Sequence, residues 1–177
     1  PRNKRLRCSI LMEYADRVIL VDTTPDLRAQ ALRCDIRNVD AILFTHGHAD
    51  HLHGLDDIRC YCFGRDEPIP CYGDAVTLER VYRVFDYAFD SAYAHALPNL
   101  ELFDIEGTLN LFGLEIDPIV VLHGRMPVLA FRAGRFAYVT DCNSIPPESM
   151  AKLYGLDTLI LAALRYREHP THFNVDQ

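Results

Sequence analysis

The histidine-rich stretch from His46 to His51 constrains the fold of this chain more than any other feature. It holds three histidines and one aspartate, and it directly follows Val39–Phe44, an apolar run typical of a buried strand. The next segment, Leu52–Ile58, has the pattern of a helix. Open α/β sheets place their binding sites on loops at the carboxyl ends of strands. The sequence therefore predicts an α/β fold with a site on this loop.

The spacing within the loop favours a metal site. Side chains two apart in an extended segment point to the same side, so His46 and His48 can bind one ion. Asp50 and His51 fall where the chain turns into the helix, beside a second ion. Imidazole and carboxylate ligands suit Zn²⁺, Mn²⁺ or Fe²⁺, and two such ions can lower the pKa of a shared water to about 7. The alternative is a surface loop with incidental metal affinity.

Two further ligand types follow strands downstream. His123 comes after the apolar run Leu114–Leu122, and Asp141 comes after Phe136–Thr140. A carboxylate has two oxygens, so Asp141 can bridge two ions. Each residue alone would more often be structural, with Asp141 as the cap of a turn. Because both repeat the position of the first cluster, we interpret them as metal ligands.

These residues resemble the motif of the metallo-β-lactamase superfamily, H-x-H-x-D-H followed by a histidine and a bridging aspartate. The matching positions are His46, His48, Asp50, His51, His123 and Asp141. The segments Val21–Arg28, His53–Arg59 and His169–Asn174 are similar to a subgroup that includes the phosphodiesterase acting on phosphoribosyl 1,2-cyclic phosphate. The resemblance implies an αββα sandwich and two divalent metal ions, Zn or Mn.

The resemblance also implies a role for each residue. The first ion would be bound by His46, His48 and His123, and the second by Asp50 and His51, with Asp141 between them. The expected catalytic residues are His172, which would protonate the leaving group, and Asp50. The family has a glycine-rich opening strand and a further ligand histidine near its C-terminus, which this sequence does not show. We therefore expect a domain truncated at both ends, with a weaker second metal site.

Composition limits the partners. A length of 177 residues predicts one domain over 1–177, and a net charge of −7 disfavours a polynucleotide but not a small anionic substrate. Six scattered cysteines form no C-x-x-C pair, which favours a reduced, cytoplasmic protein. No apolar stretch is long enough to cross a membrane, so no membrane contact is expected. The sequence does not determine the oligomeric state, for which a homodimer is one expectation.

Several functions are compatible with these residues. The first is a metal-dependent hydrolase of a small or cyclic phosphodiester, since a leaving alkoxide needs an acid such as His172. The second is a thioester, lactone or β-lactam hydrolase of the same fold. The third is an iron oxygenase, which His48 disfavours because redox relatives tend to carry Glu there. The fourth is a catalytically incompetent binding fragment.

Hydrophobic periodicity and turn residues predict the remaining elements. A hairpin turns at Ala15-Asp16, Asp74 caps a helix, and Thr158–Ala162 forms a buried strand. Tyr87, Phe89, Tyr93 and His95 belong either to a loop that shapes the substrate site or to a packed connection. The other expected helices are Pro25–Cys34 and Pro147–Tyr154, and the other expected strands are Cys8–Met12, Arg17–Asp22, Ile69–Tyr72, Leu100–Asp104, Thr108–Phe112, Leu114–Leu122, Val128–Arg132 and Phe136–Thr140.

Overall fold

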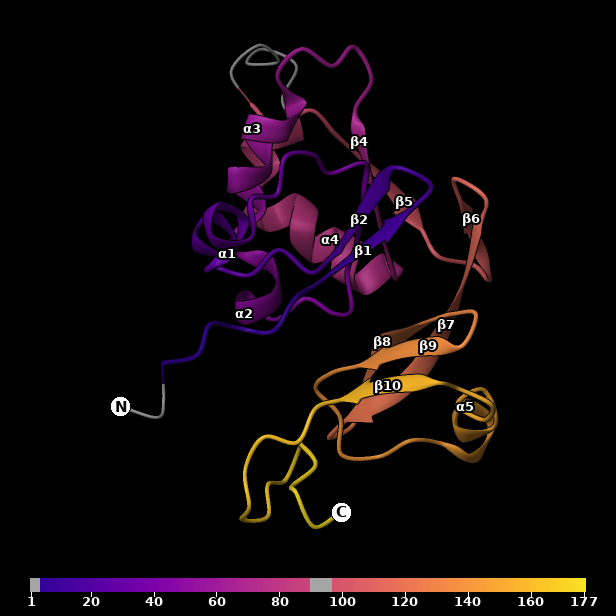
Figure 1. Ribbon diagram of the computed structural model, residues 1–177. Helices are drawn as coiled ribbons and strands as arrows, with labels where there is room; N and C mark the ends of the chain where they lie inside the picture. The colour runs from indigo at the N-terminus through magenta and orange to yellow at the C-terminus, as the bar shows by residue number, and fades with distance from the viewer. Residues whose placement is uncertain (1–3, 90–96) are drawn as a thin grey trace. The chain divides into compact units, whose positions relative to one another are not determined.

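The computed structural model describes residues 4–89 and 97–177 and divides the chain into two compact units, Pro1–Asp104 and Ile105–Gln177 (Figure 1). Each unit has its own five-stranded sheet. One domain over 1–177 stays a prediction. The first unit contains β1 (Ile10–Tyr14), β2 (Arg17–Val21), α1 (Leu27–Cys34), β3 (Ala41–Leu43), α2 (Ala49–Leu52), η1 (Leu55–Ile58), α3 (Arg59–Cys62), β4 (Ile69–Gly73), α4 (Ala75–Val84), η2 (Asp86–Phe89) and β5 (Leu100–Asp104). The second contains β6 (Leu109–Leu111), β7 (Leu114–His123), β8 (Met126–Ala133), β9 (Phe136–Val139), α5 (Pro147–Ala151) and β10 (Thr158–Leu161).

The sheet of the first unit runs β1-β2-β3-β4-β5. Its first pair is the predicted hairpin, in which Ala15 and Asp16 have φ of 47° and 61°. Positive φ at both central residues is the geometry that suits two-residue hairpin turns. The other neighbours are parallel, so β2, β3 and β4 present their carboxyl ends along one edge. This edge carries the histidine-rich loop.

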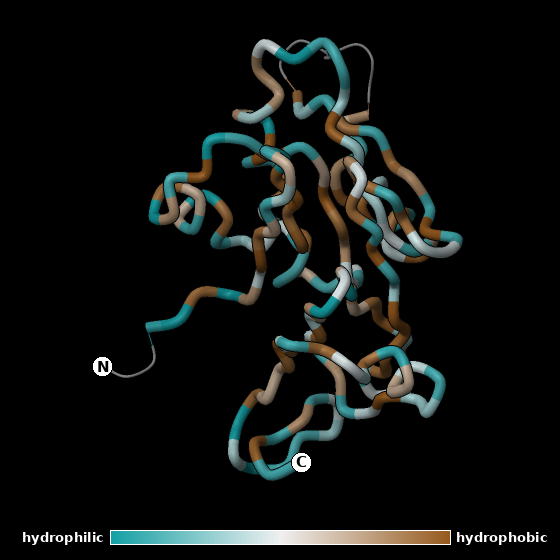
Figure 2. Tube along the Cα trace, turned by 45° about the vertical axis from the view of Figure 1, so that its right-hand side comes forward, coloured by the Kyte–Doolittle hydropathy of each residue, from teal (hydrophilic) through white to brown (hydrophobic). Residues whose placement is uncertain are grey.

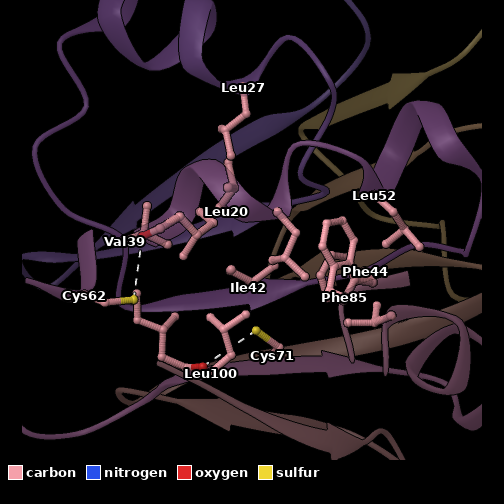
Figure 3. Packing of buried hydrophobic residues seen from close by; sticks show 14 of the residues in the cluster. Leu20, Leu27, Val39, Ile42, Phe44, Leu52, Cys62, Cys71, Phe85 and Leu100 are labelled. Atoms are coloured by element: carbon pink, nitrogen blue, oxygen red, sulfur yellow. Dashed lines mark hydrogen bonds between the residues drawn. The ribbon is translucent and has the colours of Figure 1, made fainter. Parts of the chain in front are cut away.

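The core of the first unit lies between the sheet and its helices. In Figure 2 the central strands are brown, the colour of hydrophobic residues. Ile42, Phe44 and Leu52 belong to one cluster of buried side chains and are each 0% exposed (Figure 3). Two of them, Phe44 and Leu52, flank the histidine-rich loop in sequence. Burial of both ends therefore anchors the loop to the core.

The second unit is an antiparallel meander of β6 to β9, to which β10 adds in parallel beside β9. Its core includes Ile119, Val121, Val128 and Val139, all 0% exposed. The long β7 ends at His123, and β9 ends one residue before Thr140-Asp141. Both predicted downstream ligands thus lie at strand ends, as the hydrophobic pattern indicated.

The structure corrects the prediction for Thr158–Ala162. The strand β10 is present, but Leu159, Ile160 and Leu161 are each more than 40% exposed rather than buried. Within residues 4–89 and 97–177, the strand lies at the end of its sheet and pairs with β9 along one edge. An apolar run alone cannot distinguish a central strand from an edge strand, because both carry β-forming residues.

Two helices are shorter than predicted. Helix α1 begins at Leu27 rather than Pro25, because the carbonyl of Thr24 accepts from Leu27 N and its Oγ1 accepts from Asp26 N. Helix α5 ends at Ala151 rather than Tyr154. The predicted cap of α4 is confirmed, since Asp74 Oδ1 accepts from Thr77 N at 2.7 Å. No helix in the described part of the chain is both long and apolar enough to span a membrane.

Candidate metal centre

The first group of site residues, which we call the loop cluster, consists of His46, His48, Asp50 and His51. His46 is 2% exposed, and its Nε2 lies 3.0 Å from Nδ1 of His48. Two imidazoles on one tetrahedral zinc ion, each bound at about 2.0–2.1 Å, hold their ligand nitrogens about 3.3 Å apart. The two nitrogens are therefore as close as a shared ion requires.

His51 and Asp50 lie in the short helix α2. The ring centroid of His51 is 4.3 Å from that of His46, and His51 is 3% exposed. Its Nε2 lies 3.8 Å from Oδ2 of Asp50, whose side chain is 55% exposed. The three imidazoles of the loop cluster therefore converge, and the carboxylate beside them is exposed to solvent.

Sequence reasoning did not select Asp22, which the structure places against the loop cluster. Its side chain is fully buried, with Oδ2 2.6 Å from His51 Nδ1. It also accepts from the backbone N and from Oγ1 of Thr45, both at 2.8 Å. Burial raises the pKa of Asp22, and the interactions with His51 and Thr45 oppose this rise. Asp22 therefore acts as a positioning residue for the loop.

The sequence pattern placed Asp22 at the end of the predicted strand Arg17–Asp22, and an acid at a strand end is the signal that could have identified it. In the structure β2 ends at Val21, so Asp22 follows its strand as Asp141 follows β9. The two residues also share a left-handed backbone, with φ of 64° and 37°. Aspartate adopts this conformation more readily than most residues, and such conformations cluster at functional sites.

Hydrogen-bond partners assign the ring proton of the two buried histidines. The Asp22 carboxylate can only accept, so Nδ1 of His51 donates to it. The Thr45 hydroxyl donates to Asp22 and therefore accepts from His46 Nδ1 at 3.0 Å. When such a ring is neutral, its Nε2 carries the lone pair. Fixing one nitrogen so that the other can bind a metal is the usual arrangement around metal-bound histidines.

The backbone around Gly54 holds α2 in place. Thr23 N donates to the carbonyl of His51 at 2.8 Å, and Gly54 N donates to the carbonyl of Thr23 at 2.9 Å. A Cβ on Gly54 would lie 1.9 Å from the carbonyl oxygen of Thr24. Only glycine allows the two segments to approach this closely, so Gly54 supports the position of His51.

The second group, which we call the strand-end cluster, consists of His123, Asp141 and His172. Nδ1 of His123 donates to the carbonyl of Thr171 at 2.7 Å, which again leaves Nε2 with its lone pair. The rings of His123 and His172 have centroids 4.5 Å apart, and His172 Nδ1 lies 4.0 Å from Asp141 Oδ1. The strand-end cluster thus unites three residues that are distant in sequence.

The segment that carries His172 is tied to the loop after β9. Phe173 N donates to the carbonyl of Cys142 at 2.7 Å, and the side-chain amide of Asn143 donates to the carbonyl of Pro170 at 3.2 Å. His169 lies on the same segment, with its ring centroid 4.8 Å from that of His172. These bonds hold His172 beside Asp141.

The donors of both clusters suit a divalent metal. They are imidazole nitrogens and carboxylate oxygens, without thiolates, a set that binds zinc and manganese. The three imidazoles of the loop cluster lie in one unit, and His123 and Asp141 lie in the other. The assignment of individual ligands stays a prediction.

The predicted aromatic stretch is only partly described. The hydroxyl of Tyr87 donates to Asp56 Oδ1 at 2.9 Å, whereas Tyr93 and His95 lie outside the described residues.

Comparison with known proteins identifies the fold. Residues 17–177 match the family described as "Beta-lactamase superfamily domain". The chain is 42% identical in sequence to a diphosphatase from the PhnP family whose crystal structure is known. The match covers 97% of this chain and 66% of the diphosphatase chain, with a TM-score of 0.90. The Zn²⁺-bound PqqB of Methylobacterium extorquens shares the fold, with 22% identity, a TM-score of 0.73, and coverage of 92% of this chain and 62% of its own. The two sheets thus match the metallo-β-lactamase fold, as predicted.

Among curated relatives, an octanoyltransferase of Porphyromonas gingivalis is 35% identical over 179 residues. The match covers 99% of this chain but 36% of that protein. A ribonuclease Z of Clostridium kluyveri is 30% identical over 132 residues, which cover 70% of this chain and 41% of the ribonuclease. The chain therefore spans less than half the length of these curated relatives.

Proposed function

The chain belongs to the beta-lactamase superfamily, and we propose that it is a metal-dependent hydrolase that cleaves a small, anionic phosphodiester. The observation that carries this proposal is the 42% identity to a PhnP-family diphosphatase over 97% of the chain. That name denotes hydrolysis at phosphorus. A net charge of −7 is consistent with a small substrate rather than RNA, although a ribonuclease Z is among the relatives.

We propose that the loop cluster and the strand-end cluster bind the metal together. Three or four residues of one loop are too few to complete the coordination of two metal ions. His123 and Asp141 offer a further imidazole and a further carboxylate. Divalent ions bound there would lower the pKa of a water toward 7 and offset charge on the phosphorus oxygens. Asp22 and Thr45 hold the rings of His46 and His51 at their Nδ1 atoms, which orients Nε2 of each ring for this task. The side chain of Asp50 is 55% exposed, so solvent can reach this carboxylate.

Loading the protein with Zn²⁺ or Mn²⁺ and measuring hydrolysis tests the proposal. We expect turnover of bis(p-nitrophenyl) phosphate above that of a β-lactam or of octanoyl coenzyme A, and we expect this turnover to require the added metal. Hydrolysis of the β-lactam or the thioester with no phosphodiester turnover would refute the phosphodiesterase.

The second candidate is a thioester hydrolase acting on an octanoyl group. It is favoured by the similarity to an octanoyltransferase over 99% of the chain. Since the chain spans 36% of that protein, the acyl chemistry in its name can belong to the remaining part. Octanoyl coenzyme A in the same assay separates the two candidates, because each predicts a different preferred substrate.

His172 is the residue that we propose as general acid. It lies beside Asp141 and His123, and the bonds of Cys142 and Asn143 hold its segment there. Replacing His172 by alanine should reduce hydrolysis of an alkyl phosphodiester by roughly 10²–10⁴-fold, because an alkoxide is a poor leaving group without a proton. The p-nitrophenyl ester should lose far less. Equal losses on both esters, or loss of bound metal, would contradict the assignment.

A further inference from the structure

Arg80 lies over the middle of the histidine-rich loop. It projects from α4, and its Nη1 donates to the carbonyl of Gly47 at 3.4 Å. A Cβ on Gly47 would meet Cδ of Arg80 at 2.9 Å and Nε at 3.4 Å. The side chain therefore runs along the backbone between His46 and His48, and the absence of a side chain at Gly47 makes room for it.

The charge of Arg80 is not neutralised by a protein carboxylate. On the same helix, Arg83 pairs with Glu79, whereas no carboxylate pairs with Arg80 anywhere in residues 4–89 and 97–177. A guanidinium carries five N–H donors, and the contact with Gly47 uses one of them. Arg80 is also exposed. Its remaining donors are thus available to a ligand beside the loop cluster.

The aliphatic stem and the charged end of Arg80 make different contributions. The stem packs on Gly47, and any long side chain could do this. The guanidinium adds planar donors that match phosphate oxygens, and it provides a local positive charge on a chain with a net charge of −7. A loop-packing role requires only the stem, whereas anion binding requires the charge.

We propose that Arg80 is a substrate-binding residue, which holds an anionic oxygen of the substrate beside the His46–Gly47–His48 backbone. This inference rests on the proposed function, since it makes Arg80 the cause of a preference for anionic substrates at the same site. It predicts that the enzyme prefers anionic over neutral esters at the substrate-binding step. The chemical group recognised is a phosphate oxygen.

The test uses Arg80→Met, which keeps a long apolar stem and removes the charge. Inorganic phosphate is titrated into the metal-loaded protein by calorimetry, and KM and kcat are measured for anionic bis(p-nitrophenyl) phosphate and neutral p-nitrophenyl acetate. We expect Kd for phosphate and KM for the phosphodiester to rise about 10-fold, as for loss of a hydrogen bond to a charged group. Metal content, kcat for the phosphodiester and both constants for the acetate should stay within about twofold.

Arg83→Met is the matched control, because Arg83 lies on the same helix and pairs with Glu79. It should leave phosphate binding unchanged. Unchanged phosphate binding in Arg80→Met, loss of metal, or equal losses on both esters would overturn the inference and leave a loop-packing residue. If the wild-type protein binds phosphate through Arg80 but hydrolyses no phosphodiester, the proposed function fails and the anion site stands.

Discussion

Replacing His48 by alanine is expected to remove bound metal and hydrolytic activity together. Nδ1 of His48 faces Nε2 of His46 at 3.0 Å, so the substitution deletes one of the two donors that meet at this point. Loss of residues that only support metal ligands costs about 10–100-fold in affinity or activity, and loss of a ligand should cost more than about 100-fold. Elemental analysis and hydrolysis of bis(p-nitrophenyl) phosphate measure the two effects.

His53→Ala is the control for the His48 substitution. His53 follows α2 directly and is exposed, and the centroid of its ring lies 6.4 Å from that of Phe85. Its removal tests whether any histidine of this segment affects the metal. We expect metal content and activity to stay near wild type. Stoichiometric metal in the His48 variant would mean that the ion binds elsewhere.

Gly54→Ala is expected to give the largest loss of stability among single substitutions near the site. The new Cβ would lie 1.9 Å from the carbonyl oxygen of Thr24 and 3.0 Å from Cβ of Leu27. The first of these is a backbone atom that accepts from Leu27 N at the start of α1, so it cannot move alone. Overpacking of this kind costs about 3 kcal/mol, and thermal unfolding should shift down by about 6–12 °C.

Gly107→Ala is the matched control for the Gly54 substitution. A Cβ at Gly107 meets no atom within 4 Å, and this glycine has no positive φ. The melting temperature should stay within about 2 °C of wild type. A Gly54 variant that melts at the wild-type temperature would show that the segments of Thr24 and Gly54 can separate without cost. We also expect the Gly54 variant to bind metal less tightly, because His51 lies in the helix that Gly54 follows.

Local patterns predicted much of the fold. The hairpin at Ala15-Asp16, the cap at Asp74 and the strands that end near His46, His123 and Asp141 depend on residues close in sequence, and the structure contains them. Turn and cap propensities act over a few residues, so they can be read without tertiary context. Whether β10 is covered depends on neighbours in space, and there the prediction was wrong.

The sequence by itself determined the chemistry of the site: which donors are available, and that each group follows a strand. Only the tertiary structure decided how those donors are supported. Asp22 and His51 are 29 residues apart, and Arg80 and Gly47 are 33 apart, yet each pair is in contact. Such contacts arise because parallel strands bring the ends of separate segments to one edge of a sheet. No periodicity in the sequence encodes them, since they depend on which strands become neighbours.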